Sequence, residues 1–511
     1  MNILLKKRYL FLILIVCLFS VSAVSAIEMD NNANMQANDY DSGLMAEYVD
    51  KNLLSDSYGT FQELQDEIDA VEEGGTLNLT RNYKYVNGST ASINISKPII
   101  IDGQMHTIEG IDDLKYGTII SFSIDANNVS LKNTNFINFK DFSDEGIVRW
   151  NGNNGILTNC NFTKMGYYHG AIVWNGDNGF INNSNFRNNY ADLGAAVHWL
   201  GNNGRIYSCN FTNNIAGMTA IVSWHGEKGL LYDCIFSNNT GDGSGNSVLW
   251  GSKNGCLNKC SFINNYGCSA VDIGQEYTNC SIVNCFFVNN SANEYYGGAI
   301  SCYSELSSYI LNSTFINNSA LEGGAIYCRD NKNGIISNCT FINNSADLGR
   351  SIYWTTYMDW KPACGSLINN SYSSDYDNVY AYGDNLTIIK KDSKFDINII
   401  SSEFPILIES YLIGKNENLI IKPILIEISN KNTNNSFSKY TDDNGRVNFT
   451  DLDVGTWNVT YLFEGNDNYY PCNATATITV LPPSTSLTIA DVNATVGYDV
   501  VLSANVNSPI I

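Results

Sequence analysis

The hydrophobic positions of this chain recur with a period of 24 to 28 residues over its central part. One column of the repeat is a phenylalanine, and a second column, usually a tryptophan, runs in step with it. A fixed period in this range predicts a solenoid, whose units bury their apolar face by stacking on their neighbours. The two columns are Phe136, Phe162, Phe186, Phe211, Phe236, Phe262, Phe287, Phe315 and Phe341, and Trp150, Trp174, Trp199, Trp224, Trp250, Ile273, Cys302, Cys328 and Trp354.

Alternation within each unit predicts strands. An apolar residue lies two positions before each member of the tryptophan column, and the residue between them varies and is mostly polar, as in Val148-Arg149-Trp150. This period of two indicates a strand with one buried face. The phenylalanine phrase predicts another strand, and no helical period interrupts the repeat. We therefore predict an all-β fold, a right-handed single-stranded parallel β-helix of the pectin-lyase-like type. About eleven coils at the ~4.8 Å strand spacing give a rod on the order of 50 Å long.

Paired asparagines recur two and three residues after each phenylalanine, as at Asn188-Asn189 and Asn213-Asn214. Stacked amides donate to one neighbouring coil and accept from the other. Asparagine also tolerates the left-handed conformation of a tight corner. We interpret these pairs as structural ladders rather than as a repetitive binding array.

Composition narrows the partners. The chain has 511 residues, a formal net charge of −22 and only 29 Lys and Arg. Such an acidic chain is a poor partner for nucleic acid or for an anionic membrane.

The first 26 residues have the order of a secretion signal: a basic start, an apolar run from Tyr9 to Phe19, and small residues up to Ala26. The alternative is an uncleaved membrane anchor. No later stretch is long enough to span a bilayer, so we expect no transmembrane helix in the mature chain and a secreted or cell-surface location. Residues 27–57 are rich in Asn and Asp and are expected to be a flexible segment.

Fourteen cysteines occur, of which Cys17 lies in the signal. Most of the others recur at the coil period, either two residues before the phenylalanine or, for Cys302 and Cys328, in the tryptophan column. This placement favours buried free thiols that pack as small apolar groups. A disulfide framework or a zinc site would show other spacings, and we expect no metal and no cofactor. The cysteines that lie two residues before a phenylalanine of the repeat are Cys160, Cys209, Cys234, Cys260, Cys285 and Cys339.

The ends of the solenoid carry different patterns. Phe61, Leu64, Ile68 and Val71 have helical spacing, which predicts a helix over the first coil of a β-helix spanning 58–383. Such a helix covers an open sheet end. Short strand-like runs, among them residues 446–450 and 457–463, predict a β-sandwich over 384–481. Residues 482–511 read as a linker and an incomplete second module, so the chain is either a truncated gene product or a fragment.

The repeats carry a family resemblance. The GGAISC, GGAIYC and FINNSA phrases resemble the repeats of chlamydial polymorphic outer-membrane proteins, and TDDNGRVNFTDLDVGTWNVTYLFEGNDNYY resembles a bacterial Ig-like repeat. With the signal and the capping helix, this order resembles the adhesin-like surface proteins of methanogenic archaea. The resemblance implies a cell-envelope protein with a β-helical head on an Ig-like stalk. Its expected partner is a glycan or protein on a host or neighbouring cell.

The competing interpretation is a polysaccharide-active lyase, hydrolase or esterase. These chemistries need clustered carboxylates on one outer face, as an acid/base pair or a calcium cage, sometimes with a basic residue. Asp102 and Asp272 read as isolated, and His169, His198 and His225 fall in three different columns. We therefore assign no catalytic residue and expect a binding protein rather than an enzyme.

Two groups of residues remain as candidate sites. The segment from Thr355 to Gly365 interrupts the coil rhythm with Tyr357, Trp360 and Lys361, and exposed aromatic rings suit sugar stacking. The alternative is that this segment caps the last coil. Asn-X-Ser/Thr triplets recur along an exported chain, and Asn458 and Asn473 are the best candidates for N-glycosylation because ladder amides are engaged.

Overall fold

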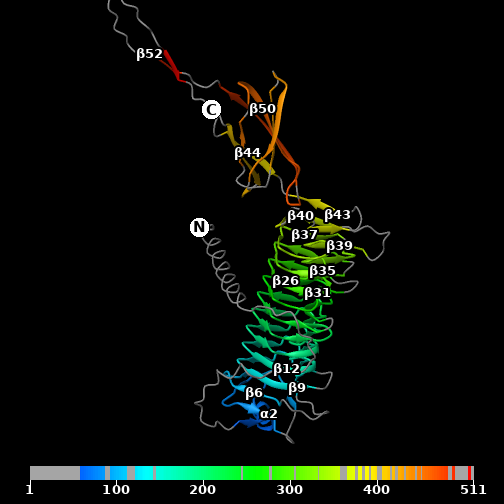
Figure 1. Cartoon of the computed structure of the whole chain (residues 1–511). Coiled ribbons are helices and arrows are strands. Elements are labelled where there is room, and N and C mark those ends of the chain that lie inside the picture. Colours follow the sequence, from blue (N-terminus) through cyan, green and yellow to red (C-terminus); the bar gives the residue numbers. More distant parts are fainter. Residues whose placement is uncertain are drawn as a thin grey trace, which may run out of the picture. The chain divides into compact units, whose positions relative to one another are not determined.

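The structure is a computed structural model, and its central part is a parallel β-solenoid of about 11 turns. Three sheets run along it, with each coil adding one strand to each sheet, from the blue end beside α2 to the yellow strand β43 in Figure 1. The residues that the structure describes are 58–86, 92–111, 121–141, 146–242, 245–274, 279–303, 306–331, 333–356, 365–373, 378–381, 386–390, 393–399, 406–414, 417–419, 424–430, 433–442, 446–450, 452–465, 467–481, 486–489 and 504–507.

We name the three sheets after their inward residues. All strand pairs along each sheet are parallel and lie in register from coil to coil. The Phe sheet contains β1 (Gly59–Thr60), β3 (Tyr83–Lys84), β6 (Thr107–Glu109), β9 (Asn135–Asp141), β12 (Asn161–His169), β15 (Asn185–Arg187), β19 (Asn210–Thr212), β23 (Ile235–Ser237), β27 (Ser261–Ile263), β30 (Phe286–Val288), β34 (Thr314–Ile316), β38 (Thr340–Ile342) and β41 (Ser371–Tyr372), with β16 (Tyr190–Leu193), β20 (Ile215–Ala216) and β24 (Thr240–Gly241) beside it.

The other two sheets follow the same coil order. The Trp sheet contains β4 (Ser92–Ile95), β7 (Ser121–Ile124), β10 (Val148–Trp150), β13 (Ile172–Trp174), β17 (Val197–Trp199), β21 (Ala220–Trp224), β25 (Asn246–Trp250), β28 (Val271–Ile273), β32 (Ile300–Cys302), β36 (Ile326–Arg329), β39 (Ile352–Thr355) and β42 (Val379–Ala381). The Ile sheet contains β2 (Thr76–Asn78), β5 (Ile100–Asp102), β8 (Ser130–Lys132), β11 (Ile156–Thr158), β14 (Phe180–Asn182), β18 (Arg205–Tyr207), β22 (Leu230–Tyr232), β26 (Gly255–Asn258), β29 (Cys280–Val283), β33 (Tyr309–Leu311), β37 (Gly334–Ser337), β40 (Gly365–Ile368) and β43 (Leu386–Ile389). A further parallel pair joins β31 (Ser291–Tyr296) and β35 (Ser319–Glu322).

The two predicted aromatic columns are inward ladders. Successive phenylalanine rings from Phe136 to Phe341 stack with centroids between 4.4 and 5.0 Å apart. The indoles from Trp150 to Trp250 stack at 4.3 to 5.0 Å. A glycine follows each of these indoles five residues later, and a Cβ on Gly229 would lie 2.3 Å from the Trp224 ring. The solenoid interior therefore combines identical stacked rings with a missing side chain beside each indole.

The paired asparagines are structural, as predicted. The first of each pair occupies the left-handed region, as at Asn264 with φ 55°. The second is buried and joins adjacent coils: Asn239 Nδ2 donates to Asn265 Oδ1 at 3.0 Å and to the Phe211 carbonyl at 2.9 Å. The same pattern continues through Asn290, whose Nδ2 donates to Asn318 Oδ1 at 3.0 Å. These ladders satisfy polar groups that would otherwise be unpaired in the core.

Cysteines of the phenylalanine phrase are buried, and every cysteine that the structure describes is a free thiol. Burial raises the pKa of the Cys160 and Cys339 thiols to about 12. Thiols protonated to this degree are inert as nucleophiles and pack as small apolar groups, which agrees with the predicted packing role.

The predicted helix near the start is α2 (Phe61–Ala70). Thr60 and Glu63 form a capping box at its first turn. Phe61, Leu64 and Ile68 are buried in the same hydrophobic core as the first coils, and the Phe61 ring lies 5.9 Å from that of Phe122. Across the described residues, no helix is long and apolar enough to cross a bilayer.

Antiparallel sheets follow the last coil. One contains β44 (Ser393–Ile399), β45 (Ile406–Gly414), β46 (Glu417–Leu419) and β49 (Arg446–Phe449), and the other contains β47 (Leu425–Asn430), β48 (Asn435–Tyr440), β50 (Gly455–Phe463) and β51 (Cys472–Val480). The strands predicted over 446–450 and 457–463 correspond to β49 and β50. Trp457, Val459 and Tyr461 of β50 lie at the centre of a second hydrophobic core. A hairpin of β52 (Ser486–Ile489) and β53 (Ala504–Asn507) comes last.

Candidate functional site

The outer face of the Trp sheet carries the side chains with the most chemistry. Each strand presents its middle residue outward, and these residues lie in register on adjacent coils. We call this column the outer row. It consists of Arg149, Val173, His198, Ser223, Leu249, Asp272, Ser301, Tyr327, Tyr353 and Tyr380.

Three histidines meet on the early part of the outer row. The rings of His169 and His198 have centroids 5.3 Å apart, and those of His198 and His225 are 5.2 Å apart. The three columns in which these histidines were predicted to lie are therefore neighbours in space. His169 ends a long strand of the Phe sheet, and this strand carries it round the corner to the edge of the Trp sheet.

The electrostatics of this histidine cluster favour neutral imidazoles. Burial, together with the smaller effects of the neighbouring His225 and His169 rings, lowers the pKa of His198 to about 4. The His198 Nδ1 is buried and has no hydrogen-bond partner in the part of the chain that the structure describes. His225 Nε2 lies 3.0 Å from the Ser223 hydroxyl, but Ser223 is fully buried and out of reach of a substrate. Among the described residues no group of three His, Cys, Asp or Glu side chains is arranged to hold a metal ion.

Tyrosines occupy the later part of the outer row. Tyr327 stacks on Tyr353 at 5.4 Å, and Tyr353 stacks on Tyr380 at 5.1 Å. Tyr296 stacks on the other side of Tyr327 at 4.6 Å, and Tyr303 lies tilted beside Tyr327 at 5.6 Å. We call these five residues the tyrosine cluster. Its rings are layered along the solenoid, and exposure rises from 5 % at Tyr327 to 39 % at Tyr380.

Charged groups border the tyrosine cluster. The Arg329 guanidinium lies over the Tyr303 ring at 4.6 Å, a cation–π contact. Burial raises the pKa of Tyr303 and Tyr327 above the usual range, so both phenols stay protonated at neutral pH. Protonated phenols both donate and accept hydrogen bonds, which suits them to ligands rich in hydroxyl groups.

Asp272 belongs to this neighbourhood and is not isolated. Its carboxylate accepts a hydrogen bond from the Ser301 hydroxyl at 3.0 Å. Burial raises the pKa of Asp272 to about 6, and the Ser301 hydrogen bond only partly opposes the shift. A carboxyl with a pKa of about 6 exchanges protons near neutral pH, as a general acid or base does.

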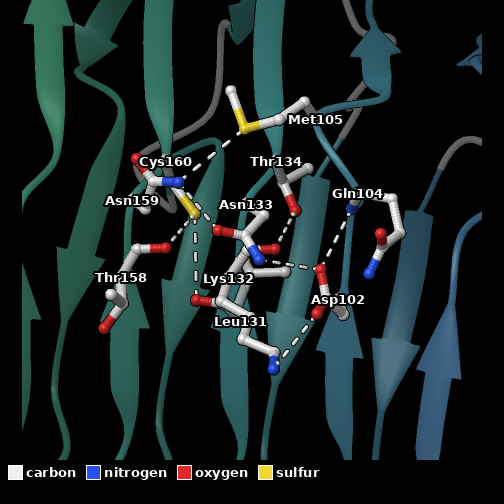
Figure 2. Close-up of polar contacts among 10 residues, drawn as sticks. All are labelled: Asp102, Gln104, Met105, Leu131, Lys132, Asn133, Thr134, Thr158, Asn159 and Cys160. Carbon is white, nitrogen blue, oxygen red and sulfur yellow. Dashed lines mark hydrogen bonds and ion pairs between the residues drawn. The ribbon is translucent and has the colours of Figure 1, made fainter.

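Asp102 is also not isolated, but its partners give it a structural role. Lys132 Nζ lies 3.1 Å from its carboxylate, and Asn133 Nδ2 and the Gln104 backbone N–H donate to it at 2.9 and 3.1 Å (Figure 2). Burial alone would raise the pKa of Asp102, but the Asn133 and Gln104 hydrogen bonds and the Lys132 ammonium outweigh it, and the pKa lies below its ordinary value. The side chain ties coils together and is 6 % exposed, so it is not a candidate acid or base.

The predicted site residues are only partly within the described chain. Tyr357, Trp360 and Lys361 lie outside the described residues. Asn473 is exposed on β51, whereas Asn458 is partly buried on β50 between β47 and β51. Sequence reasoning missed Tyr303 and Arg329, which follow the outward position of their strands by two residues. The signal for the tyrosine cluster was the unbroken run Tyr327, Tyr353 and Tyr380 in the outer row.

Comparisons with known proteins give a short family match. A model of the Chlamydia polymorphic membrane protein repeat matches residues 312–329, which is one part of one coil. No curated protein matches the chain. The repeat match agrees with the predicted resemblance at that coil, and it is too short to assign the whole chain to a family.

Solved structures match this chain only at low sequence identity and low TM-score. An alginate lyase solved with G6 is 14% identical, with a TM-score of 0.45 over 66% of this chain and 84% of its own. A PL6 family polysaccharide lyase from Pseudopedobacter saltans is 12% identical, with a TM-score of 0.43 over 65% and 90%. The tailspike of E. coli bacteriophage HK620, solved with a pentasaccharide, is 13% identical, with a TM-score of 0.31 over 82% and 88%. Values this low carry over neither substrate nor activity.

Proposed function

We propose that this protein is an adhesin-like, secreted or cell-surface protein whose β-helical head binds glycans through the outer face of its Trp sheet. The observation that carries the proposal is the tyrosine cluster, a layered set of aromatic side chains on the outer face of the Trp sheet that runs from the buried Tyr327 to the exposed Tyr380. Aromatic residues with polar tips are typical of binding surfaces because one part of the ring is apolar and the hydroxyl bonds to polar groups.

The chemistry of the cluster fits a sugar chain. Stacked tyrosines cover each other's ring faces, so the surface they offer is made of ring edges and phenol hydroxyls, with Tyr380 the most open ring. The parallel sheet fixes these hydroxyls at coil spacing, which reduces the entropy cost of binding. The segment with Tyr357, Trp360 and Lys361 directly follows β39, the strand of Tyr353, and we propose that it extends the same surface.

The rest of the chain supports display outside the cell. In this proposal residues 1–26 direct export, 27–57 form a tether, and α2 closes the first coil of the head over 58–383. Residues 384–481 form an Ig-like stalk module, and 482–511 begin another. N-glycosylation then falls on the stalk, with Asn473 ahead of Asn458 because its side chain is exposed.

A glycan array probed with the full chain tests this function. Tyr380→Ala should lower the affinity for every glycan that the wild type binds by about tenfold, as expected when one stacking side chain is lost. The matched control is Tyr309→Ala, which removes a tyrosine of similar exposure from the outer face of the Ile sheet. Absence of binding by the wild type, or equal losses in the two variants, would contradict the proposal.

A second candidate function is favoured by Asp272 alone. A carboxyl with a raised pKa of about 6 beside protonated tyrosines could serve as the acid of a β-helical polysaccharide lyase, hydrolase or esterase. The test is release of reducing or unsaturated ends from any glycan that binds. Release of such ends that is abolished by Asp272→Asn, while glycan affinity is retained, would show that Asp272 is the acid of a glycan-cleaving enzyme.

A further inference from the structure

A second outer face carries a separate hollow, and most of the residues that line it have polar side chains. A groove of about 430 Å³ lies on the outside of the Phe sheet, and we call it the Arg187 groove. Ligand sites commonly have volumes of this order. It spans three adjacent strands, β12, β15 and β19, and its lining residues are Asn161, Thr163, Asn185, Phe186, Arg187, Asn210 and Thr212.

The register of the three strands sets the geometry of this groove. Asn161, Asn185 and Asn210 form one column, and Thr163, Arg187 and Thr212 form the parallel column two residues along. The Phe186 ring points inward and is fully buried, so its strand forms the floor. With strands ~4.8 Å apart and ~3.3 Å per residue, the polar platform measures roughly 10 by 7 Å, comparable to a disaccharide.

Arg187 is the centre of the platform and has no counter-charge. Within the part of the chain that the structure describes, its guanidinium makes no ion pair and no hydrogen bond, and its side chain is exposed. The register neighbours of Arg187 are threonines, Thr163 on one adjacent coil and Thr212 on the other. A planar guanidinium binds a carboxylate through two parallel hydrogen bonds, which is stronger and more directional than a single one.

The amide column has a direction and an open end. Asn161 Nδ2 donates to Asn135, Asn185 Nδ2 donates to Asn161 at 2.8 Å, and Asn210 Nδ2 donates to Asn185 at 2.8 Å. The next residue in the column is Ile235, which offers no amide. The Asn210 Oδ1 therefore remains an acceptor at the edge of the groove, positioned for a hydroxyl of a ligand.

From these contacts we infer that the Arg187 groove binds a carboxylated saccharide. Arg187 binds the carboxylate, and the Asn210 amide and the threonine hydroxyls bind the hydroxyl groups of the sugar ring. The inference rests on the proposed glycan-binding function and names a second, chemically distinct subsite for it. With a net charge of −22 on the chain, long polyanions are repelled, so the groove suits a short acidic saccharide or the acidic end of a longer glycan.

The test is calorimetric titration of the full chain with a uronate tetrasaccharide and with its carboxyl-reduced, neutral counterpart. The wild type should bind the uronate at least tenfold more tightly than the neutral form, and added salt should narrow that difference. Arg187→Ala should abolish the preference, and Arg187→Lys should restore part of it, because the charge returns without the planar fork. Arg205→Ala, on the outer face of the Ile sheet, is the matched control and should change the affinity less than twofold.

Each outcome separates this inference from the proposed function. Equal binding of the charged and neutral ligands, or equal losses in Arg187→Ala and Arg205→Ala, would overturn the groove and leave the tyrosine cluster standing if Tyr380→Ala still weakens binding. A uronate preference that needs Arg187 but is indifferent to Tyr380→Ala would support the groove and contradict the outer row as the glycan site. Failure of the wild type to bind any glycan would overturn both.

Discussion

The two faces of each strand in the Trp sheet follow different rules. In β36, Ile326 and Cys328 point inward, and Ile326 continues a ladder of Val and Ile residues that runs through many coils. Tyr327 between them belongs to a row that begins with Arg149 and ends with Tyr380. Every inward side chain must be apolar and must pack against its neighbours on the adjacent coils, whereas the outer face has no such requirement. The inward side chains therefore determine the fold, and any function specific to this chain depends on the outward side chains.

Removal of an inward ring should have the largest effect on this contrast. Phe262→Ala takes a fully buried ring out of a stack with neighbours 4.8 and 4.9 Å away, and should lower the free energy of unfolding by about 3–5 kcal/mol. Ser261→Ala changes the adjacent outward position of the same strand and should cost less than about 0.5 kcal/mol. Chemical denaturation, with hydrogen exchange to locate the weakened coils, measures both. Equal costs would contradict the division between the faces.

A ladder amide should have a smaller effect than a ring. Asn265→Ala removes the acceptor of both the Asn239 backbone N–H, at 3.1 Å, and the Asn239 Nδ2, at 3.0 Å. The loss should be about 2–3 kcal/mol because buried donors are left without partners. The corresponding exposed amide is Asn210, and Asn210→Ala should cost under about 1 kcal/mol because water replaces its partners. A loss for Asn265→Ala no larger than that for Asn210→Ala would show that the buried ladder is not structural.

The histidine cluster should make the outer face sensitive to acid. The folded-state pKa of His198 is about 4, below its ordinary value of 6.5, so the folded state favours the neutral ring. Its contribution to stability is complete above pH about 6.5 and is lost as the pH falls to about 4. After allowance for partial exposure we expect a loss of about 1–2 kcal/mol over that range. His198→Gln should flatten this part of the stability profile, and an unchanged profile would show that His198 titrates normally.

The smallest effect concerns N-glycosylation of the two C-terminal sequons, which changes the mass of the protein more than its stability. Asn473 is exposed on an edge strand, whereas Asn458 is partly buried on a central strand. Glycopeptide mass spectrometry of protein from its native host should find a glycan on Asn473 more often than on Asn458. Unmodified peptides at both positions would rule out the glycoprotein hypothesis for this module.

The sequence predicted what the coil period controls and missed what it does not. The ring and amide ladders follow from spacing alone, because a side chain at a fixed place in each unit meets its equivalents on the neighbouring coils. The histidine cluster does not, because His169 comes from the Phe sheet and His198 from the Trp sheet, and the corner between them varies in length. Tyr303 lies one residue beyond β32, and Arg329 is the last residue of β36, where the coil period gives no conserved kind of residue. The Arg187 groove is a candidate site because Arg187 has no ion-pair partner among the described residues, and the composition of the chain does not show which charges are paired.

The in-register ladders also determine how this molecule can change in length over evolution. Asn214 and Asn239 are equivalent positions 25 residues apart, and each makes the same hydrogen bonds with its neighbours. Loss or duplication of the segment between them joins one equivalent position to another, so every ring and amide still meets a matching partner. A deletion of half that length would place polar side chains opposite rings and break all the ladders at once. Whole coils are therefore the natural units of gain and loss, and the length of the solenoid changes in steps of one strand spacing, ~4.8 Å.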